Sequence, residues 1–293
     1  MFQKIELRKT RDFSAKINIT FEFIRENFRI LAKSMIYISG PFILIGGICA
    51  GLYQQKSLSG LGQGIFGNVF NEWYGVMIIF ILLGNISTMI VVNEFVRLYE
   101  LKDDPQTIEV SEIWEGVKEN FIRILLAMFV VTFLLIVSFI ILILPFFYVG
   151  TVLSLVAPIM IIEKKNFGDA FSRCFYLISE KWWSTFGILV VTVLIAGFMG
   201  YIFQLPQLVF TVVFTLHKTS DSMAEPPLWE QAGILVSSVI STVGSNLLQS
   251  IIFVAMIFQF YNLVERKEAQ GLLNRLDSFG KTDVNAPRHD ETY

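Results

Sequence analysis

The phrase FEFIRENF at residues 21–28 returns as WEGVKENF at residues 114–121 and as FYLISEKW at residues 175–182. Each copy has an aromatic residue at both ends, Ile or Val in the fourth position and Glu in the sixth, and each precedes a long apolar run. An internal repeat is the sequence signature of a repeated structural unit. We therefore predict an all-α integral membrane protein built from three units, each a cytoplasmic amphipathic helix followed by a transmembrane hairpin.

The composition indicates that lipid surrounds most of this chain. Apolar residues make up 54% of its 293 residues and charged residues only 16%, against about 25% charged in a soluble domain. Five runs contain no charged residue, and each reaches the roughly 20 residues that a membrane-spanning helix needs. These runs are residues 34–55, 73–93, 124–162, 182–217 and 231–264.

Two of these runs are too long for one span. Residues 124–162 contain Pro145, which cannot continue a helix cleanly, so we predict two helices joined by a tight turn there. In residues 182–217 we expect one span ending near Pro206. The prediction is six spans, at residues 30–54, 73–97, 121–144, 146–163, 182–206 and 231–264.

The basic residues indicate the orientation of these spans. With six spans, 21 of the 23 Lys and Arg residues fall on the side that holds both termini, and only Lys56 and Lys218 fall on the other side. The positive-inside rule then places both termini in the cytoplasm. We expect a bacterial-type cytoplasmic (inner) membrane protein without a cleaved signal peptide. It would have one membrane domain at residues 1–272, with repeat units at about 15–100, 108–165 and 166–268, and a flexible cytoplasmic tail at 273–293.

Each phrase is predicted to lie in an amphipathic helix at the membrane surface. In the first copy an apolar stripe recurs at helical spacing, and we expect charged neighbours such as Lys16 on the other faces. The stripe consists of Ile17, Phe21, Ile24 and Phe28. In the third copy Asn166 is a candidate N-cap, with Asp169 three residues later. The expected elbows between surface helix and span hold the pairs Glu26 and Phe28, Glu119 and Phe121, and Glu180 and Trp182.

The glutamates of the phrase allow two interpretations. The three carboxylates could line a central cytoplasmic opening, or they could lie at the headgroup level as ordinary solvated charges. A second group of glutamates ends the even-numbered spans, in the contexts IVVNEF, IMIIEKK and YNLVERK, at Glu94, Glu163 and Glu265. Their recurrence supports three hairpins.

The stretch APIMIIEKKNFGDAFSRCFYLISEKWWSTFGIL at residues 157–189 resembles the glycerophosphodiester phosphodiesterase membrane-domain superfamily. Members of that group repeat a module of an aliphatic run, a Glu, an aromatic-rich amphipathic helix and the next span. The resemblance implies a membrane domain only. We carry over neither a catalytic domain nor an enzymatic activity.

Polar residues inside the spans are the candidate functional residues, since such residues mark function or helix contacts. One face of the sixth span carries them at helical spacing, and Asn85 in the second span adds to them. The candidates on the sixth span are Ser238, Ser241, Thr242, Ser245, Asn246 and Gln249. This face could form the polar wall of a cavity, or it could be a helix contact.

The sequence contains no recognisable catalytic, metal or cofactor motif. His217 and His289 have no partner at metal-ligand spacing, and the lone Cys49 and Cys174 are expected to be small buried apolar residues. We expect no enzyme activity, no cofactor and no nucleic-acid partner. The first function hypothesis is a scaffold or assembly protein whose partners are membrane lipids and possibly other membrane proteins or itself. The alternative is a permease or lipid-handling protein with a polar cavity between the hairpins.

Overall fold

The described part of the chain is helical and holds no strand. A computed structural model describes residues 4–59, 72–220 and 227–269. The predicted tail at 273–293 and the Gly-rich segment after the first span lie outside these residues. The helices are α1 (Phe13–Ser34), the π-helix η1 (Met35–Ser39), α2 (Gly40–Ser59), α4 (Glu72–Leu101), the 3-10 helix η2 (Pro105–Thr107), α5 (Val110–Ile141), α6 (Ile143–Leu153), α7 (Val156–Ile162), α8 (Phe167–Ile178), α9 (Trp182–Ser220) and α10 (Leu228–Glu268).

Six helical stretches among these residues are long and apolar enough to cross a membrane, which confirms the predicted number. The chain is therefore a multi-pass membrane protein. The predicted break in the long run is also confirmed: α5 ends at Ile141, Leu142 is extended, and α6 begins at Ile143 with Pro145 in its first turn. The predicted end of span five at Pro206 is wrong, since α9 continues through this proline. Neighbouring helices let a membrane helix tolerate such a residue.

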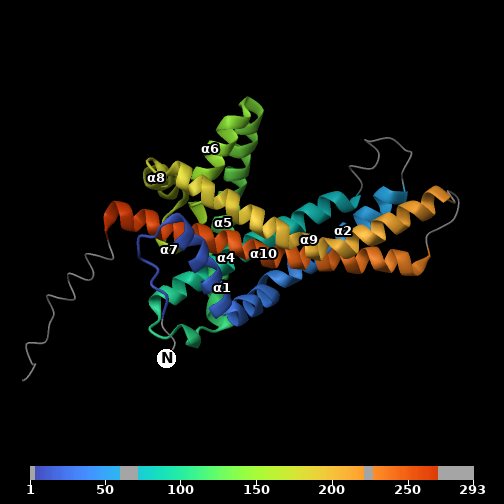
Figure 1. Cartoon of the computed structure of the whole chain (residues 1–293), viewed down its shortest axis with the longest axis horizontal. Helices are drawn as coiled ribbons and strands as arrows, with labels where there is room; N and C mark the ends of the chain where they lie inside the picture. Colours follow the sequence, from blue (N-terminus) through green and yellow to red (C-terminus); the bar gives the residue numbers. More distant parts are fainter. Residues whose placement is uncertain (1–3, 60–71, 221–226, 270–293) are drawn as a thin grey trace, which may run out of the picture.

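Helix α10 is the centre of the bundle. It packs against α9, α2 and α4, and α2 also packs against α4. Figure 1 shows α2, α4, α9 and α10 lying along the long axis of the molecule. Consecutive spans α2–α4 and α9–α10 therefore form the two predicted outer hairpins.

Glycines allow the close approach of α2 to α10. A Cβ added at Gly47 would lie 3.0 Å from the Cα of Val239, and one added at Gly51 would lie 3.0 Å from the Cα of Leu235. These neighbours are backbone atoms, which cannot rotate away. Helix pairs in membranes commonly approach through glycines four residues apart, because little apolar driving force exists between them in lipid.

The first span differs from its prediction. Helices α1, η1 and α2 follow one another without a gap, so no elbow interrupts the helix at Phe28. The only irregularity is the π-helix, where the amide of Gly40 donates to the carbonyl of Met35. Pro41 follows directly. Its ring would collide with the carbonyl four residues back, and a locally wider helix relieves such a collision.

The expected elbow at Phe121 is also absent, because α5 runs from Val110 to Ile141 without a break. Only the third copy shows a separate surface helix, α8, followed by a turn before α9. At its start the predicted cap is confirmed: the side chain of Asn166 accepts a hydrogen bond from the amide of Asp169 at 2.9 Å. Neither of the first two phrases contains a proline that would stop the helix.

The buried face of α1 is not the predicted apolar stripe. Lys16, which we had placed among the charged outer faces, is only 3% exposed, whereas Phe28 is 58% exposed. The residues that pack inward are Lys16, Thr20, Phe23, Asn27, Leu31 and Ser34. An apolar stripe is compatible with lipid, so in a membrane protein it need not mark the interior.

The middle hairpin is unlike the other two. Figure 1 shows α6 projecting from the side of the bundle, whereas the outer hairpins lie along its axis. Its span is broken at Ser154 and Leu155 into α6 and α7. The outer part of α6 is exposed, with Leu144 at 79%, while α7 is buried from Val156 to Ile161. The three hairpins therefore do not have the same arrangement, and the break in span four was not predicted.

Candidate functional site

The predicted polar face of α10 is engaged in contacts with other helices. The side-chain amide of Asn246 donates to Oδ1 of Asn85 at 2.8 Å, and the hydroxyl of Thr88 donates to Oδ1 of Asn246 at 2.8 Å. Both partners lie on α4. The structure thus brings together two predicted residues from different spans, Asn85 and Asn246.

A second polar contact joins α10 to α2 and α9. The amide of Gln207 donates to Oε1 of Gln54 at 2.6 Å and to the hydroxyl of Ser238 at 3.4 Å, and Gln54 donates in turn to Thr211 at 2.5 Å. Such side-chain bonds between membrane helices are worth about 0.6–2 kcal/mol each. The polar residues of α2 and α9 that complete this network were not among the predicted candidates.

The other members of the predicted face are buried or partly buried. Ser241 is buried, Ser245 and Gln249 are partly buried, and the hydroxyl of Thr242 donates to the carbonyl of Ser238 at 2.7 Å. A small cavity of about 80 Å³ lies beside Asn246, but apolar residues and a glycine of η1, α2 and α10 form the rest of its lining. The interpretation as a helix contact therefore describes this face better than a polar wall does.

The three glutamates of the phrase lie at the surface of the described structure. Glu26, Glu119 and Glu180 are all exposed, as expected for solvated charges. The buried polar residue of the phrase is instead the asparagine that follows the Glu in the first two copies. Asn27 donates to the carbonyl of Phe23 at 2.9 Å, and Asn120 donates to that of Gly116 at 3.0 Å.

The remaining elbow aromatics have separate surroundings. Phe121 is partly buried, and its ring stacks on Phe42 of α2 at 6.3 Å between centroids. Trp182 stacks on Tyr148 at 5.9 Å and on Phe186 at 5.0 Å. The third elbow thus contacts α6 of the middle hairpin, which sequence spacing alone did not indicate.

Two of the glutamates that end the even spans, Glu94 and Glu163, accept hydrogen bonds from residues of the helices that carry the second and third phrases. Glu94 is 1% exposed and accepts from Arg97 and Asn120, each at 2.7 Å. A Cβ added at Gly116 would lie 2.6 Å from the Glu94 carboxyl carbon, so this glycine makes room for it. The Glu94 carboxylate therefore bonds to the guanidinium of Arg97 and the side-chain amide of Asn120, and it lies close to the α5 backbone at Gly116.

Arg173 of α8 joins the ends of two spans. It donates to both oxygens of Glu163 at 2.6 Å and to those of Glu268 at 2.5 and 3.1 Å. These hydrogen bonds, that of Glu268 first, raise the pKa of Arg173 above its usual value. Arg173 therefore stays charged and fixes the end of α7 to the end of α10.

A second buried polar group links α1 to the bundle. Nζ of Lys16 donates to Oε1 of Gln259 at 2.8 Å and to the hydroxyl of Ser184 at 3.2 Å, and Gln259 donates to Thr185 at 2.8 Å. A buried ammonium group needs such partners to offset its lost hydration. The sequence analysis had treated this lysine as an ordinary surface charge.

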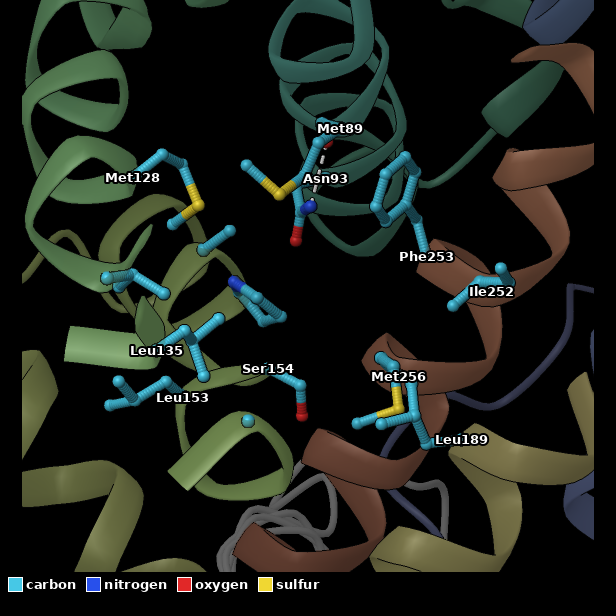
Figure 2. A pocket seen from close by; sticks show the side chains of 14 residues that line it. Met89, Asn93, Met128, Leu135, Leu153, Ser154, Leu189, Ile252, Phe253 and Met256 are labelled. Carbon is cyan, nitrogen blue, oxygen red and sulfur yellow. Dashed lines mark hydrogen bonds between the residues drawn. The ribbon is translucent and has the colours of Figure 1, made fainter. Parts of the chain in front are cut away.

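An apolar pocket of about 220 Å³ lies between the middle hairpin and the bundle. It lies where span four is broken, and α4, α5, α6, α7, α9 and α10 all contribute side chains (Figure 2). Its lining includes Met89, Met128, Leu135, Gly150, Leu189 and Met256. Flexible methionines adapt to irregular apolar surfaces, so the lining is suited to an aliphatic group.

Two polar side chains also line this pocket. Asn93 is 1% exposed, and its Nδ2 donates to the carbonyl of Met89 at 2.8 Å, whereas its buried Oδ1 has no hydrogen-bond partner. Figure 2 shows this oxygen directed away from the α4 backbone and into the pocket. The hydroxyl of Ser154 donates to the carbonyl of Thr151 at 2.7 Å. Asn93 belongs to the IVVNEF context that had drawn attention only to its neighbour Glu94.

No group of His, Cys, Asp or Glu within the described residues could hold a metal ion. Both cysteines are buried, as predicted. Burial is the first cause that raises the pKa of the Cys174 thiol to about 12, and Glu163 adds to it. Neither thiol is placed as a nucleophile.

A family model described as a domain of unknown function, DUF7847, matches residues 77–263. The chain belongs to this family. The match extends from α4 into α10 and includes every residue that lines the 220 Å³ pocket, as well as Asn85 and the whole polar face of α10. The first copy of the repeated phrase lies outside it. No curated protein and no solved structure matches the chain.

Proposed function

We propose that this protein is a non-enzymatic membrane protein that binds the apolar part of a membrane lipid in the pocket beside the broken span. The pocket itself carries this proposal, because its lining is almost wholly apolar and it lies among helices that lipid surrounds. Ligand sites between bundle helices are common. The polar cavity expected of a solute permease has less support, since the polar face of α10 bonds to α2, α4 and α9.

The proposed setting is a bacterial-type inner membrane with both termini in the cytoplasm. The distribution of 21 of 23 basic residues supports it. We also propose that the repeated phrase marks a repeated structural unit. The resemblance of residues 157–189 to the glycerophosphodiester phosphodiesterase membrane-domain superfamily is part of the same proposal. The equivalent backbone contacts of Asn27 and Asn120 support a common origin of the first two copies.

Photocrosslinking in proteoliposomes tests lipid binding. The probe is a phospholipid that carries a diazirine near the end of one acyl chain, and the labelled peptides are mapped by mass spectrometry. We expect labelling of the segments around Met128 and Ser154. Labelling restricted to the outer surface of α5 and α9 would contradict the proposal.

A pair of glycine variants provides the control. A Cβ added at Gly150 would lie 3.5 Å from Cδ2 of Leu135, whereas one added at Gly197 would have no neighbour within 4 Å. Gly150→Leu should fill the pocket and abolish labelling there, while Gly197→Leu should leave it unchanged. Equal labelling in both variants would show that the probe does not enter the pocket.

A scaffold or assembly protein is the second candidate. The polar face of α10 gives this function little support, because internal contacts occupy that face. The exposed middle hairpin favours it instead: Phe129 and Ile140 are each 76% exposed, and α6 projects from the bundle (Figure 1). Purification from membranes with a stoichiometric protein partner, lost when Phe129 and Ile140 are replaced by alanine, would favour this function over lipid binding.

A further inference from the structure

Asn93 presents an acceptor with no donor in the pocket. Its Oδ1 is buried without a partner, and the orientation of its amide is set by the bond from Nδ2 to the Met89 carbonyl. Turning the amide over would place two oxygens against each other, so the acceptor must face the pocket. A buried oxygen without a hydrogen bond costs about 1–3 kcal/mol.

Ser154 offers the same kind of group. Its only hydrogen is given to the Thr151 carbonyl at 2.7 Å, so its oxygen can only accept a further bond. The pocket thus presents acceptors and lacks charged side chains. A ligand that brings an ester, an ether or a carboxylate would leave these oxygens unpaired, and a carboxylate would also lack a cation.

We propose that the pocket selects a membrane lipid with a free hydroxyl group at the end of an aliphatic segment, a long-chain alcohol, whose O–H donates to Oδ1 of Asn93. The inference rests on the proposed lipid binding and names the class of lipid. An apolar cavity of about 150 Å³ holds one benzene molecule, so 220 Å³ holds the hydroxyl and the adjoining carbons while the rest of the chain remains in the bilayer.

Competition with the photoactivatable phospholipid tests this preference in the full chain. The competitors are a long-chain alcohol, its methyl ether and the alkane of equal length. A neutral hydrogen bond contributes about 0.5–1.5 kcal/mol. We therefore expect the alcohol to compete about three- to tenfold more strongly than the ether, and the ether about as strongly as the alkane.

The variant Asn93→Leu removes the acceptor and keeps the site apolar. We expect the alcohol and the ether to compete equally well in this variant, with pocket labelling retained. Ser154→Ala should reduce the preference by less, because Asn93 remains. A preference that persists unchanged in Asn93→Leu would overturn the assignment.

The wild-type comparison decides the matter even if the variant does not fold. Equal competition by the alcohol and the ether would overturn the inference and leave lipid binding intact. An ordered water molecule that already donates to Oδ1 of Asn93 would have the same consequence. If the wild type showed no pocket labelling that Gly150→Leu abolishes, the proposed function itself would be contradicted.

Discussion

Replacement of Gly244 by alanine tests how α9 and α10 pack. Gly244 lies on the central helix and is buried. A Cβ added there would lie 2.8 Å from the Cβ of Phe203 on α9 and closer still to its ring. The Phe203 Cβ is attached directly to its backbone, so rotation of the ring does not relieve the contact. The helices must therefore move apart or the side chain must take a strained rotamer.

The magnitude follows from two opposing effects. Overpacking a well-filled interior costs about 1–3 kcal/mol, whereas alanine gains up to about 1 kcal/mol over glycine in a helix interior. Gly197→Ala on α9 carries the same gain in helix propensity, but its Cβ would meet nothing within 4 Å. The difference between the two variants therefore isolates the packing cost, and we expect Gly244→Ala to be less stable by about 1–3 kcal/mol.

Unfolding in mixed micelles, titrated with SDS and followed by circular dichroism, measures both free energies. The far-ultraviolet signal of the folded state should match among the wild type and both variants, so that only the midpoint moves. If Gly244→Ala proves as stable as Gly197→Ala, then α9 and α10 do not approach one another as described, and the central position of α10 would be wrong.

Three further predictions concern the ends of the bundle and its orientation. Arg173→Met should lower the free energy of unfolding by about 2–4 kcal/mol, because it leaves two largely buried carboxylates without their cation. As a control, Arg25→Met at an exposed position should change the free energy of unfolding by less than about 0.5 kcal/mol. At pH 8 the native protein should react very slowly with maleimide at Cys174, whose thiol has a pKa of about 12, and readily after unfolding in SDS; fast native labelling would contradict its burial. A cysteine at Ser222 should be labelled by an impermeant maleimide from outside the cell and one at Ser278 should not, and the reverse pattern would overturn the proposed orientation.

Two features of the pocket had signals in the sequence that the predictions did not use. Asn93 is a polar residue in an apolar span, which is a signal for function or helix contact, and it could have been included with Asn85. The break at Ser154 and Leu155 also had a signal, because the ring of Pro158 would collide with the carbonyl of Ser154, four residues back. Its position depends on the separate packing of α7, which contacts α4 and α8, and of α6, which contacts α5.

The sequence by itself determined the class of protein, the number of spans and the turn before Pro145. Length, charge and proline act locally, so they can be read along the chain. Only the tertiary structure decided which face of each helix is buried. Lipid and the protein interior are both apolar, so hydrophobic periodicity does not distinguish them, and on α1 the apolar stripe did not indicate which residues pack inside the bundle. The same reason explains why the oxygen of Asn93 lacks a partner: whether a polar atom in a span is bonded depends on what the neighbouring helices bring to it.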